Sequence, residues 1–342
     1  MPRSRSEPRQ GENLAQQYGG YHTGRWISHL PASWIPFVQL ARLSPPAGLC
    51  LVLFPHLFGL LNACILEPQP LGKVIRAFGL MATGSLFLSN AIHGWNDLID
   101  APIDKLVART KHRPIVRGAV TPRAALLFTL SQALAAAAVL LLYLPDAAAK
   151  AAVPSIIFNF YYPWSKRHTH AAQLVLGVSL GWGVIVGTSA ADGASAPWKG
   201  DSTFVPTACL FASSVLWTVV YDTIYAFQDI VDDQRVGLKS TAVLFQENTK
   251  YFLWVCLGAQ IGLLSAHGYL LRSGAGYFVV AVGGCAAALG SMIARVDLKS
   301  PQSCWSWFRY GFWLAGGSIT GGLLWQAWCE GAHVAGSQMM AD

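Results

Sequence analysis

Charged residues are scarce in this chain. Asp, Glu, Lys and Arg together make up 12% of its 342 residues, whereas hydrophobic residues make up 53%. An average soluble domain carries about 25% charged residues, and half that share leaves too little polar surface to cover a water-soluble particle. The composition therefore excludes an ordinary soluble protein and indicates a protein of the lipid bilayer.

The cysteines lack the spacing of a metal site or a disulfide framework. All seven occur singly, with no CxxC pair and no Cys/His ligand pattern. Most lie in apolar stretches, where a thiol is usually an inert core residue. The sequence therefore supports neither a zinc site nor a set of disulfides.

Long apolar segments are abundant, and a bilayer-crossing helix needs roughly 20 mostly apolar residues. Nine candidates lie near residues 43–65, 73–96, 122–143, 147–163, 171–190, 204–227, 250–271, 275–294 and 307–329. Spacings such as Gly183-x-x-x-Gly187 favour close packing of helices. We expect an all-α membrane protein with nine transmembrane helices in a single domain over residues 41–330. A polar N-terminal tail and interfacial segment (1–40) precede it, and a short tail (331–342) follows.

Basic residues lie mostly on one side of the predicted spans. The N-terminal tail and the loops after the even-numbered spans, with their flanks, hold every Lys and Arg except Lys73, Arg76, Lys150, Lys199 and Arg272. Cytoplasmic loops carry such an excess, so the net charge of +7 indicates orientation and we expect no nucleic-acid partner. Residues 1–30 lack the hydrophobic region of a signal peptide. We expect the endoplasmic reticulum or another endomembrane, in preference to the mitochondrial inner membrane.

Acidic residues are few, and seven of the 17 fall in two clusters. The first, at the end of the second span, contains Asp97, Asp100 and Asp104. Their spacing of i, i+3 and i+7 places them on one face if the helix continues. Pro102 lies between them and can bend that turn.

The second acidic cluster follows the sixth span. Asp222, Asp229 and Asp233 are spaced i, i+7 and i+11, which again predicts one helix face, whereas Asp232 points elsewhere. Both clusters are expected at cytoplasmic helix ends, where six converging carboxylates repel one another unless cations neutralise them. Mg²⁺ binds through one or two carboxylates together with substrate phosphates. We therefore predict a diphosphate clamp between the two clusters.

Two other interpretations of the acids are weaker. A single Asp near a helix end is usually a solvated cap, but this does not account for two regularly spaced clusters in so acid-poor a chain. Intramembrane acids also mark ion pathways in transporters. Those acids lie near the bilayer midplane, where the predicted spans are almost free of charge.

Basic residues flank both acidic clusters. Arg109 and Arg113 follow the first cluster and Lys239 follows the second. Arginine forks match phosphate oxygens, so we expect these side chains to contact phosphate. The segment from Tyr162 to Arg167, which includes Lys166, is delivered to the same face by the topology.

Five motifs together resemble one family. They are RLxxPxG (Arg42–Gly48), NDxxDxxxD (Asn96–Asp104), RTxxRP (Arg109–Pro114), YPxxKR (Tyr162–Arg167) and DxxYAxxDxxDDxxxGxKS (Asp222–Ser240). These are similar to the motifs of the UbiA superfamily of intramembrane prenyltransferases, whose fold is a helical bundle around a central cavity. The complete last motif is most similar to the 4-hydroxybenzoate polyprenyltransferase branch.

A closer resemblance concerns the substrates. Residues 18–26 and the lack of a long transit peptide resemble fungal enzymes that prenylate aromatic polyketides in meroterpenoid pathways, many of which use farnesyl diphosphate. Ser44-Pro45 departs from ubiquinone-pathway relatives, which usually have a polar pair there. The resemblance implies transfer of a prenyl group, with farnesyl expected, to a carbon of a phenolic acid or aromatic polyketide. A 4-hydroxybenzoate polyprenyltransferase of ubiquinone biosynthesis and a UbiA-type terpene cyclase remain alternatives.

The resemblance also implies roles for individual residues. Two Mg²⁺ ions would be held by Asp97, Asp100, Asp104, Asp229 and Asp233. Substrate-binding residues would be Arg42, Arg109, Arg113, Lys166 and Lys239. Arg42 is the candidate for the acceptor carboxylate, and Asn96 would orient a substrate group. The phenol proton would pass to Asp222, Asp229 or Tyr162, a choice that the sequence leaves open.

Overall fold

The computed structural model describes residues 26–191 and 200–339, and every regular element within them is helical. The all-helical prediction is therefore confirmed. In chain order the elements are η1 (Ile27–His29), α2 (Ile35–Leu40), α3 (Ala47–Leu66), α4 (Leu71–Asp104), η2 (Thr110–His112), α5 (Pro122–Tyr143), α6 (Asp146–His168), α7 (Ala172–Gly181), α8 (Gly183–Ala190), α9 (Asp201–Ala226), α10 (Ile230–Val236), α11 (Thr241–Phe245), η3 (Gln246–Asn248), α12 (Thr249–Leu270), α13 (Ala275–Tyr277), the π-helical turn η4 (Phe278–Gly283), α14 (Gly284–Arg295) and α15 (Pro301–Met339).

Seven helical segments of the described chain are long and apolar enough to cross a membrane. They are Ala47–Leu66, Leu71–Asp104, Pro122–Tyr143, Ala172–Ala190, Ser202–Ala226, Thr241–Leu270 and Ala275–Arg295. The other two expected spans coincide with α6 and α15, whose described residues include no window of sufficient hydropathy. The count of nine transmembrane helices therefore stays a prediction. So does the division into domain and tails, and α15 continues past residue 330 to Met339.

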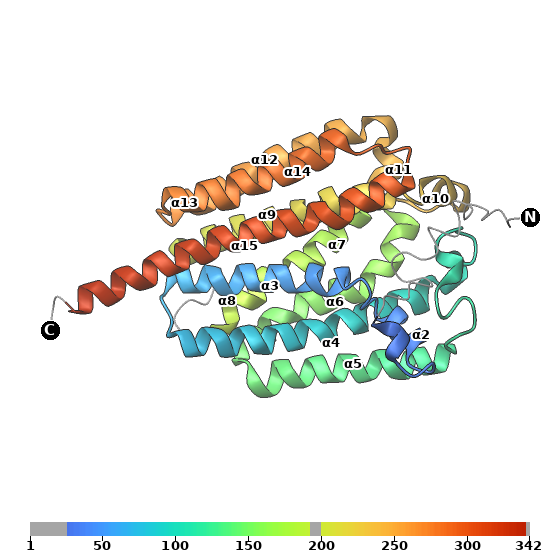
Figure 1. The fold of residues 1–342 in the computed structure, drawn as a ribbon, viewed down its shortest axis with the longest axis horizontal. Coiled ribbons are helices and arrows are strands. Elements are labelled where there is room, and N and C mark those ends of the chain that lie inside the picture. The colour runs from blue at the N-terminus through green and yellow to red at the C-terminus, as the bar shows by residue number, and fades with distance from the viewer. Residues whose placement is uncertain (1–25, 192–199, 340–342) are drawn as a thin grey trace, which may run out of the picture.

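The long helices run side by side in one elongated bundle (Figure 1). α12 and α14 lie along one side, α4 and α5 lie along the opposite side, and α3, α9 and α15 lie between them. Aromatic side chains fill the centre. The ring of Trp217 in α9 lies 5.8 Å from that of Phe54 and 5.7 Å from that of Phe58, both in α3. These ring contacts hold α3 against α9.

Glycine permits the closest helix contact in the bundle. A Cβ atom on Gly59 of α3 would lie 2.1 Å from the Val184 carbonyl oxygen, and one on Gly187 of α8 would lie 2.2 Å from the His56 carbonyl oxygen. No other residue type fits at this spacing without moving a backbone. The packing predicted from the small-residue spacing is thus confirmed for α8.

A buried polar network ties five helical elements together. His267 Nε2 lies 2.9 Å from Asn62 Oδ1, and His267 Nδ1 lies 2.9 Å from the Tyr277 hydroxyl. The Asn62 amide donates to Thr207 at 2.9 Å and to Thr188 at 3.2 Å. All five side chains are fully buried. Unpaired polar groups are costly inside a bilayer, so these contacts fix α3, α8, α9, α12 and α13 relative to one another.

The short elements gather at one end of the bundle. In Figure 1, α2, α10 and α11 lie at this end. The Ala108 amide donates to Asp232 Oδ2 at 2.7 Å, and Arg235 Nη2 donates to the Leu106 carbonyl at 3.3 Å. These contacts join the connection after α4 to α10. The two carboxylate-bearing segments, expected from sequence to converge, therefore meet at the same end.

Candidate active site

A cavity of about 180 Å³ lies where α4 and α9 end. The polar residues that line it, called the wall here, include every candidate site residue predicted from the sequence except Asp97. These are Arg42, Asn96, Asp100, Asp104, Arg109, Arg113, Tyr162, Lys166, Asp222, Asp229, Asp233 and Lys239. Its apolar lining includes Leu51, Val52, Leu176, Leu180 and Phe308. The cavity thus combines a polar end with an apolar floor.

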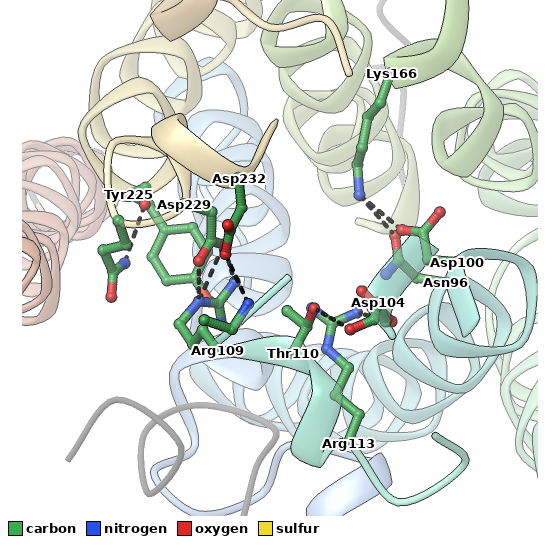
Figure 2. A network of polar contacts seen from close by, with 12 residues as sticks. Asn96, Asp100, Asp104, Arg109, Thr110, Arg113, Lys166, Tyr225, Asp229 and Asp232 are labelled. Carbon is green, nitrogen blue, oxygen red and sulfur yellow. Dashed lines mark hydrogen bonds and ion pairs between the residues drawn. The ribbon is translucent and has the colours of Figure 1, made fainter. Parts of the chain in front are cut away.

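The wall balances acids against bases. Five carboxylates and five Lys or Arg side chains of the described chain line the cavity. Figure 2 shows some of these groups, with Asp100 and Asp104 on one side and Asp229 and Arg109 on the other. Because the charges cancel, the site can receive a metal–diphosphate complex, whose own charges also largely offset one another, at small electrostatic cost.

The first carboxylate group lies in the last two turns of α4. This helix continues through Pro102 to Asp104, so the expected shared face forms. Lys166 Nζ lies 2.9 Å from Asp100 Oδ2, and Arg113 Nη1 lies 2.7 Å from Asp104 Oδ2. Thr110 Oγ1 donates to the Asp104 carbonyl at 3.1 Å, which folds the connection back over the helix end.

The second carboxylate group does not lie on one continuous helix. α9 ends at Ala226, and α10 begins at Ile230, one residue after Asp229. The predicted single helix over residues 222–233 is therefore wrong. The bend nevertheless leaves Asp222, Asp229 and Asp233 on the cavity wall.

Arg109 forms an ion pair with Asp229, which lies in the bend between α9 and α10. Its Nε lies 3.0 Å from both carboxylate oxygens, and its Nη2 lies 2.5 Å from Oδ2. The guanidinium also lies 5.2 Å from the centre of the Tyr225 ring, a distance at which a cation and an aromatic face attract. Arg109 joins the motif after α4 to the motif after α9.

The Gly237–Ser240 segment docks on the end of α6. Gly237 has a φ of 77°, a left-handed conformation that favours glycine, and it ends α10. The Lys239 amide then donates to the Lys166 carbonyl at 2.8 Å, and Lys239 Nζ donates to the His168 carbonyl at 3.3 Å. The Ser240 side chain caps α11 by accepting from the Val243 amide. These contacts explain how the GxKS pattern brings the YPxxKR segment to the site.

Asp97 lies behind the wall. Its side chain is 1% exposed, and its Oδ1 lies 2.7 Å from Arg42 Nη2 and 3.1 Å from Arg113 Nη1. Burial alone would lower the pKa of Arg113, but the carboxylates of Asp104 and Asp97 raise it above its usual range. Both guanidinium groups face the cavity from the other side.

Three residues outside the predicted set also take part in or support the site. Asp232, expected to point elsewhere, binds the Ala108 amide and so fixes the connection after α4. Gln173 lies on the cavity wall and hydrogen-bonds the Asp222 carboxylate. His93 also lines the wall, with Nδ1 2.7 Å from the Ser89 carbonyl. Only the position of His93 one turn before Asp97 gave a signal; an isolated Gln in an apolar span gives none.

The donor set suits a metal that is shared with a ligand. Within residues 26–191 and 200–339, no three His, Cys, Asp or Glu side chains form a cluster that could hold an ion alone. However, Asp100 Oδ1 is buried without a hydrogen-bond donor in this part of the chain. Burial and the nearby Asp229 charge raise the pKa of Asp233 to about 7, a crowding that a divalent cation relieves. These oxygens fit Mg²⁺, which takes its remaining ligands from phosphates and water.

Fold and cavity together define a class of protein: a membrane helical bundle with a cavity lined by acidic, basic and apolar side chains. The chain belongs to the UbiA prenyltransferase family, whose model matches residues 52–316. It is a prenyltransferase, as its curated relatives are.

Two of these relatives cover most of the chain. The mitochondrial 4-hydroxybenzoate polyprenyltransferase of Saccharomyces cerevisiae is 36% identical over 84% of this chain and 75% of its own length. Prenyltransferase stbC of Stachybotrys bisbyi is 33% identical over 95% of this chain and 96% of its own. A 4-hydroxybenzoate polyprenyltransferase is therefore among the relatives, as the sequence motifs suggested.

Solved structures share the fold. A UbiA homologue from Aeropyrum pernix K1 matches with a TM-score of 0.67 and 25% identity, over 80% of this chain and 96% of that chain. A UbiA homologue from Archaeoglobus fulgidus, bound to GPP and Mg²⁺, matches with a TM-score of 0.59 and 17% identity, over 87% of this chain and 99% of that chain.

Proposed function

We propose that this prenyltransferase uses Mg²⁺ to transfer a farnesyl group from farnesyl diphosphate to a ring carbon of a phenolic acid or aromatic polyketide, in meroterpenoid biosynthesis. One observation carries the proposal: two carboxylate groups and the Lys and Arg side chains paired with them line one cavity above an apolar floor. Such a cavity accommodates the diphosphate at the charged end and the prenyl chain on the apolar lining.

The donor diphosphate is proposed to bind between Asp100 and Asp104 on one side and Asp229 and Asp233 on the other. When bound there, Mg²⁺ would neutralise the charge that develops on the leaving diphosphate. Arg113 is placed to donate to phosphate oxygens, and Arg109 keeps Asp229 in position. Lys166 and Lys239 complete the positive wall.

The carbon–oxygen bond of the donor breaks with both electrons on the diphosphate, which leaves an allylic cation. The apolar lining keeps water from this cation. Tyr225 and Tyr221 line the cavity, where an aromatic face can stabilise positive charge. A π-electron pair of the acceptor ring then forms the new carbon–carbon bond.

The acceptor is proposed to bind with its carboxylate at Arg42 and a polar group at Asn96, which share the wall with His93. The phenol proton is proposed to pass to Asp222 as the carbon–carbon bond forms, and the hydrogen on the attacked ring carbon is then lost as a proton while the phenol oxygen is protonated again, which restores the aromatic ring. Asp229 is engaged by Arg109, and the Tyr162 ring lies 4.9 Å from Lys166 Nζ. Asp222, by contrast, has a neutral partner in Gln173 and no ion pair with any residue that the structure describes.

The membrane context is also proposed. We place the charged end of the cavity at the cytosolic face of the endoplasmic reticulum or another endomembrane, because the basic loops are expected there. The prenyl chain would extend between helices or along lipid. The mitochondrial relatives make the mitochondrial inner membrane the alternative location.

A second function is favoured by one observation, the 36% identity to a 4-hydroxybenzoate polyprenyltransferase. Membranes containing the protein would be incubated with Mg²⁺ and either farnesyl diphosphate or a longer polyprenyl diphosphate. Each donor would be offered with an orsellinic-type acid and with 4-hydroxybenzoate. We expect farnesylation of the orsellinic-type acid; preference for 4-hydroxybenzoate with the longer donor would assign the ubiquinone pathway.

Two controls separate the remaining alternatives, a terpene cyclase and a transporter. A terpene cyclase would consume farnesyl diphosphate with no acceptor present. A transporter would move solute in vesicles from which EDTA has removed Mg²⁺, whereas the proposed enzyme loses turnover under that treatment and regains it when Mg²⁺ is restored.

A further inference from the structure

Asp97 differs from its two partners in the first motif. Asp100 and Asp104 line the cavity, but Asp97 does not. Its side chain is 1% exposed, and one of its oxygens meets two guanidinium groups, Arg42 at 2.7 Å and Arg113 at 3.1 Å. Its other oxygen, Oδ2, is buried without a hydrogen-bond donor among the described residues, as Asp100 Oδ1 is, but Asp97 does not line the cavity in which the metal would be held.

We propose that Asp97 is a positioning residue that aims Arg42 and Arg113 at the two substrates, and that it is not a metal ligand. This inference rests on the proposed function, since it assigns Arg42 to the acceptor and Arg113 to the diphosphate. It removes Asp97 from the expected set of metal ligands and leaves Asp100, Asp104, Asp229 and Asp233 in that set.

The geometry explains why one carboxylate holds two arginines. Like-charged guanidinium groups brought together in a buried site repel each other. A shared anion between them offsets this repulsion and fixes both side chains. Arg113 Nη1 also reaches Asp104 Oδ2 at 2.7 Å. Arg113 therefore spans from the hidden carboxylate to one on the wall.

The backbone of Arg42 supports the same assignment. Its φ is 52°, in the left-handed region that residues with a Cβ atom occupy only when their surroundings compel it. Arg42 lies in the turn after α2, where its amide donates to the Gln39 carbonyl at 3.1 Å, and its side chain pairs with Asp97. Loss of the Asp97 charge would free the Arg42 side chain from its place on the cavity wall.

Mn²⁺ binding separates a positioning role from a metal-binding role without measuring turnover. Purified full-length protein would be titrated with Mn²⁺ by electron paramagnetic resonance in the presence of a non-hydrolysable farnesyl thiodiphosphate, at a concentration that saturates each variant, so that weaker contact of Arg113 with the diphosphate does not change the Mn²⁺ affinity. We expect Asp97→Asn to bind Mn²⁺ within about twofold of the wild type. Asp100→Asn should weaken binding about tenfold or more, as expected for loss of a ligand or its orienting partner. Equal weakening by both substitutions would overturn the proposal.

Kinetics separate positioning from a merely structural role. Asp97→Asn and Arg42→Gln should each raise the KM for the aromatic acceptor about tenfold or more, as loss of a charge-assisted contact would. The double variant should raise it no further, because both changes disable the same contact. Multiplicative effects on KM, or an unchanged KM in Asp97→Asn, would overturn the assignment.

Unfolding of the metal-free, substrate-free protein tests the pairing independently of the proposed function. Asp97→Asn leaves two buried guanidinium groups without their shared anion, so we expect its thermal midpoint in EDTA to fall by about 5 °C or more. If it accumulates too poorly to purify, membrane abundance is compared instead. The double variant Asp97→Asn/Arg42→Gln should have a higher thermal midpoint than Asp97→Asn alone. If the decreases caused by the two single substitutions simply add in the double variant, the pairing is overturned. A wild type that binds no Mn²⁺ with the analogue would contradict the proposed function, and the unfolding cycle would then decide the pairing alone.

Discussion

The contact between Arg109 and Asp229 can be tested by a substitution that keeps the positive charge but removes the two-point contact with the carboxylate. Arg109→Lys preserves a positive group but replaces a planar fork with a single ammonium. The fork makes contacts of 3.0, 3.0 and 2.5 Å to the two carboxylate oxygens, and its central carbon lies over the Tyr225 ring, 5.2 Å from the ring centre. Lysine cannot reproduce the two-point contact.

The size of the effect follows from what is lost. A hydrogen bond to a charged group contributes about 1.5–3 kcal/mol, and each 1.4 kcal/mol corresponds to about a tenfold change in rate. If lysine retains one contact of the fork, kcat/KM should fall about ten- to a hundredfold. Because Asp229 keeps a nearby cation, the protein should still fold and insert.

The assay is prenyl transfer by purified membranes at saturating Mg²⁺, with product separated by chromatography and normalised to protein abundance. Arg123→Lys is the matched control, because Arg123 is exposed at the start of α5 and should leave kcat/KM unchanged. Wild-type kcat/KM in Arg109→Lys would refute the reasoning that this fork orients Asp229 for donor binding.

Three further predictions concern packing, proton transfer and metal. Gly59→Ala should lower the thermal midpoint, because its Cβ would lie 2.1 Å from the Val184 carbonyl oxygen and such overpacking costs about 1–3 kcal/mol; Gly258→Ala, with open space around it, should not lower it. Asp222→Asn should reduce kcat at least about a hundredfold, in the range of general-base catalysis, with the donor KM unchanged; loss of donor binding instead would contradict its role as proton acceptor. Exchange of Mg²⁺ for Ca²⁺ should abolish turnover while the protein stays folded by circular dichroism, because Ca²⁺ prefers longer and more numerous oxygen contacts; full activity with Ca²⁺ would show that no Mg²⁺-sized site is needed.

Much of the site could be predicted from the sequence because its residues recur at helical spacing. Asp100 and Asp104 follow an apolar span and lie one turn apart, so their common face required only a helix that continues. The distribution of basic residues among the loops predicted the topology, and this topology placed Lys166 at the same end of the bundle as both acidic clusters. These inferences depend on local periodicity and topology, which the sequence carries directly.

Other features depend on tertiary contacts that no spacing encodes. The break between Ala226 and Ile230 left Asp229 reachable by Arg109, although periodicity suggested one helix. The helix expected over residues 171–190 is divided at Trp182, whose Nε1 donates to the Ala151 carbonyl at 2.7 Å. The position of Asp97 outside the cavity lining likewise involves its ion pair with Arg42, which lies in the turn after α2. In each case the residue concerned contacts a partner distant in sequence.

The central claim is that the α4 carboxylates and the carboxylates that follow α9 bind one Mg²⁺–diphosphate complex from opposite sides of the cavity. The direct measurement is Mg²⁺-dependent binding of farnesyl thiodiphosphate to purified wild type, Asp100→Asn and Asp229→Asn by isothermal titration calorimetry. Asp146→Asn, on the exposed first turn of α6, serves as control. We predict that binding requires Mg²⁺ and weakens about tenfold or more in either cavity variant but not in the control. Wild-type affinity in either cavity variant, or binding that persists in EDTA, would contradict the claim.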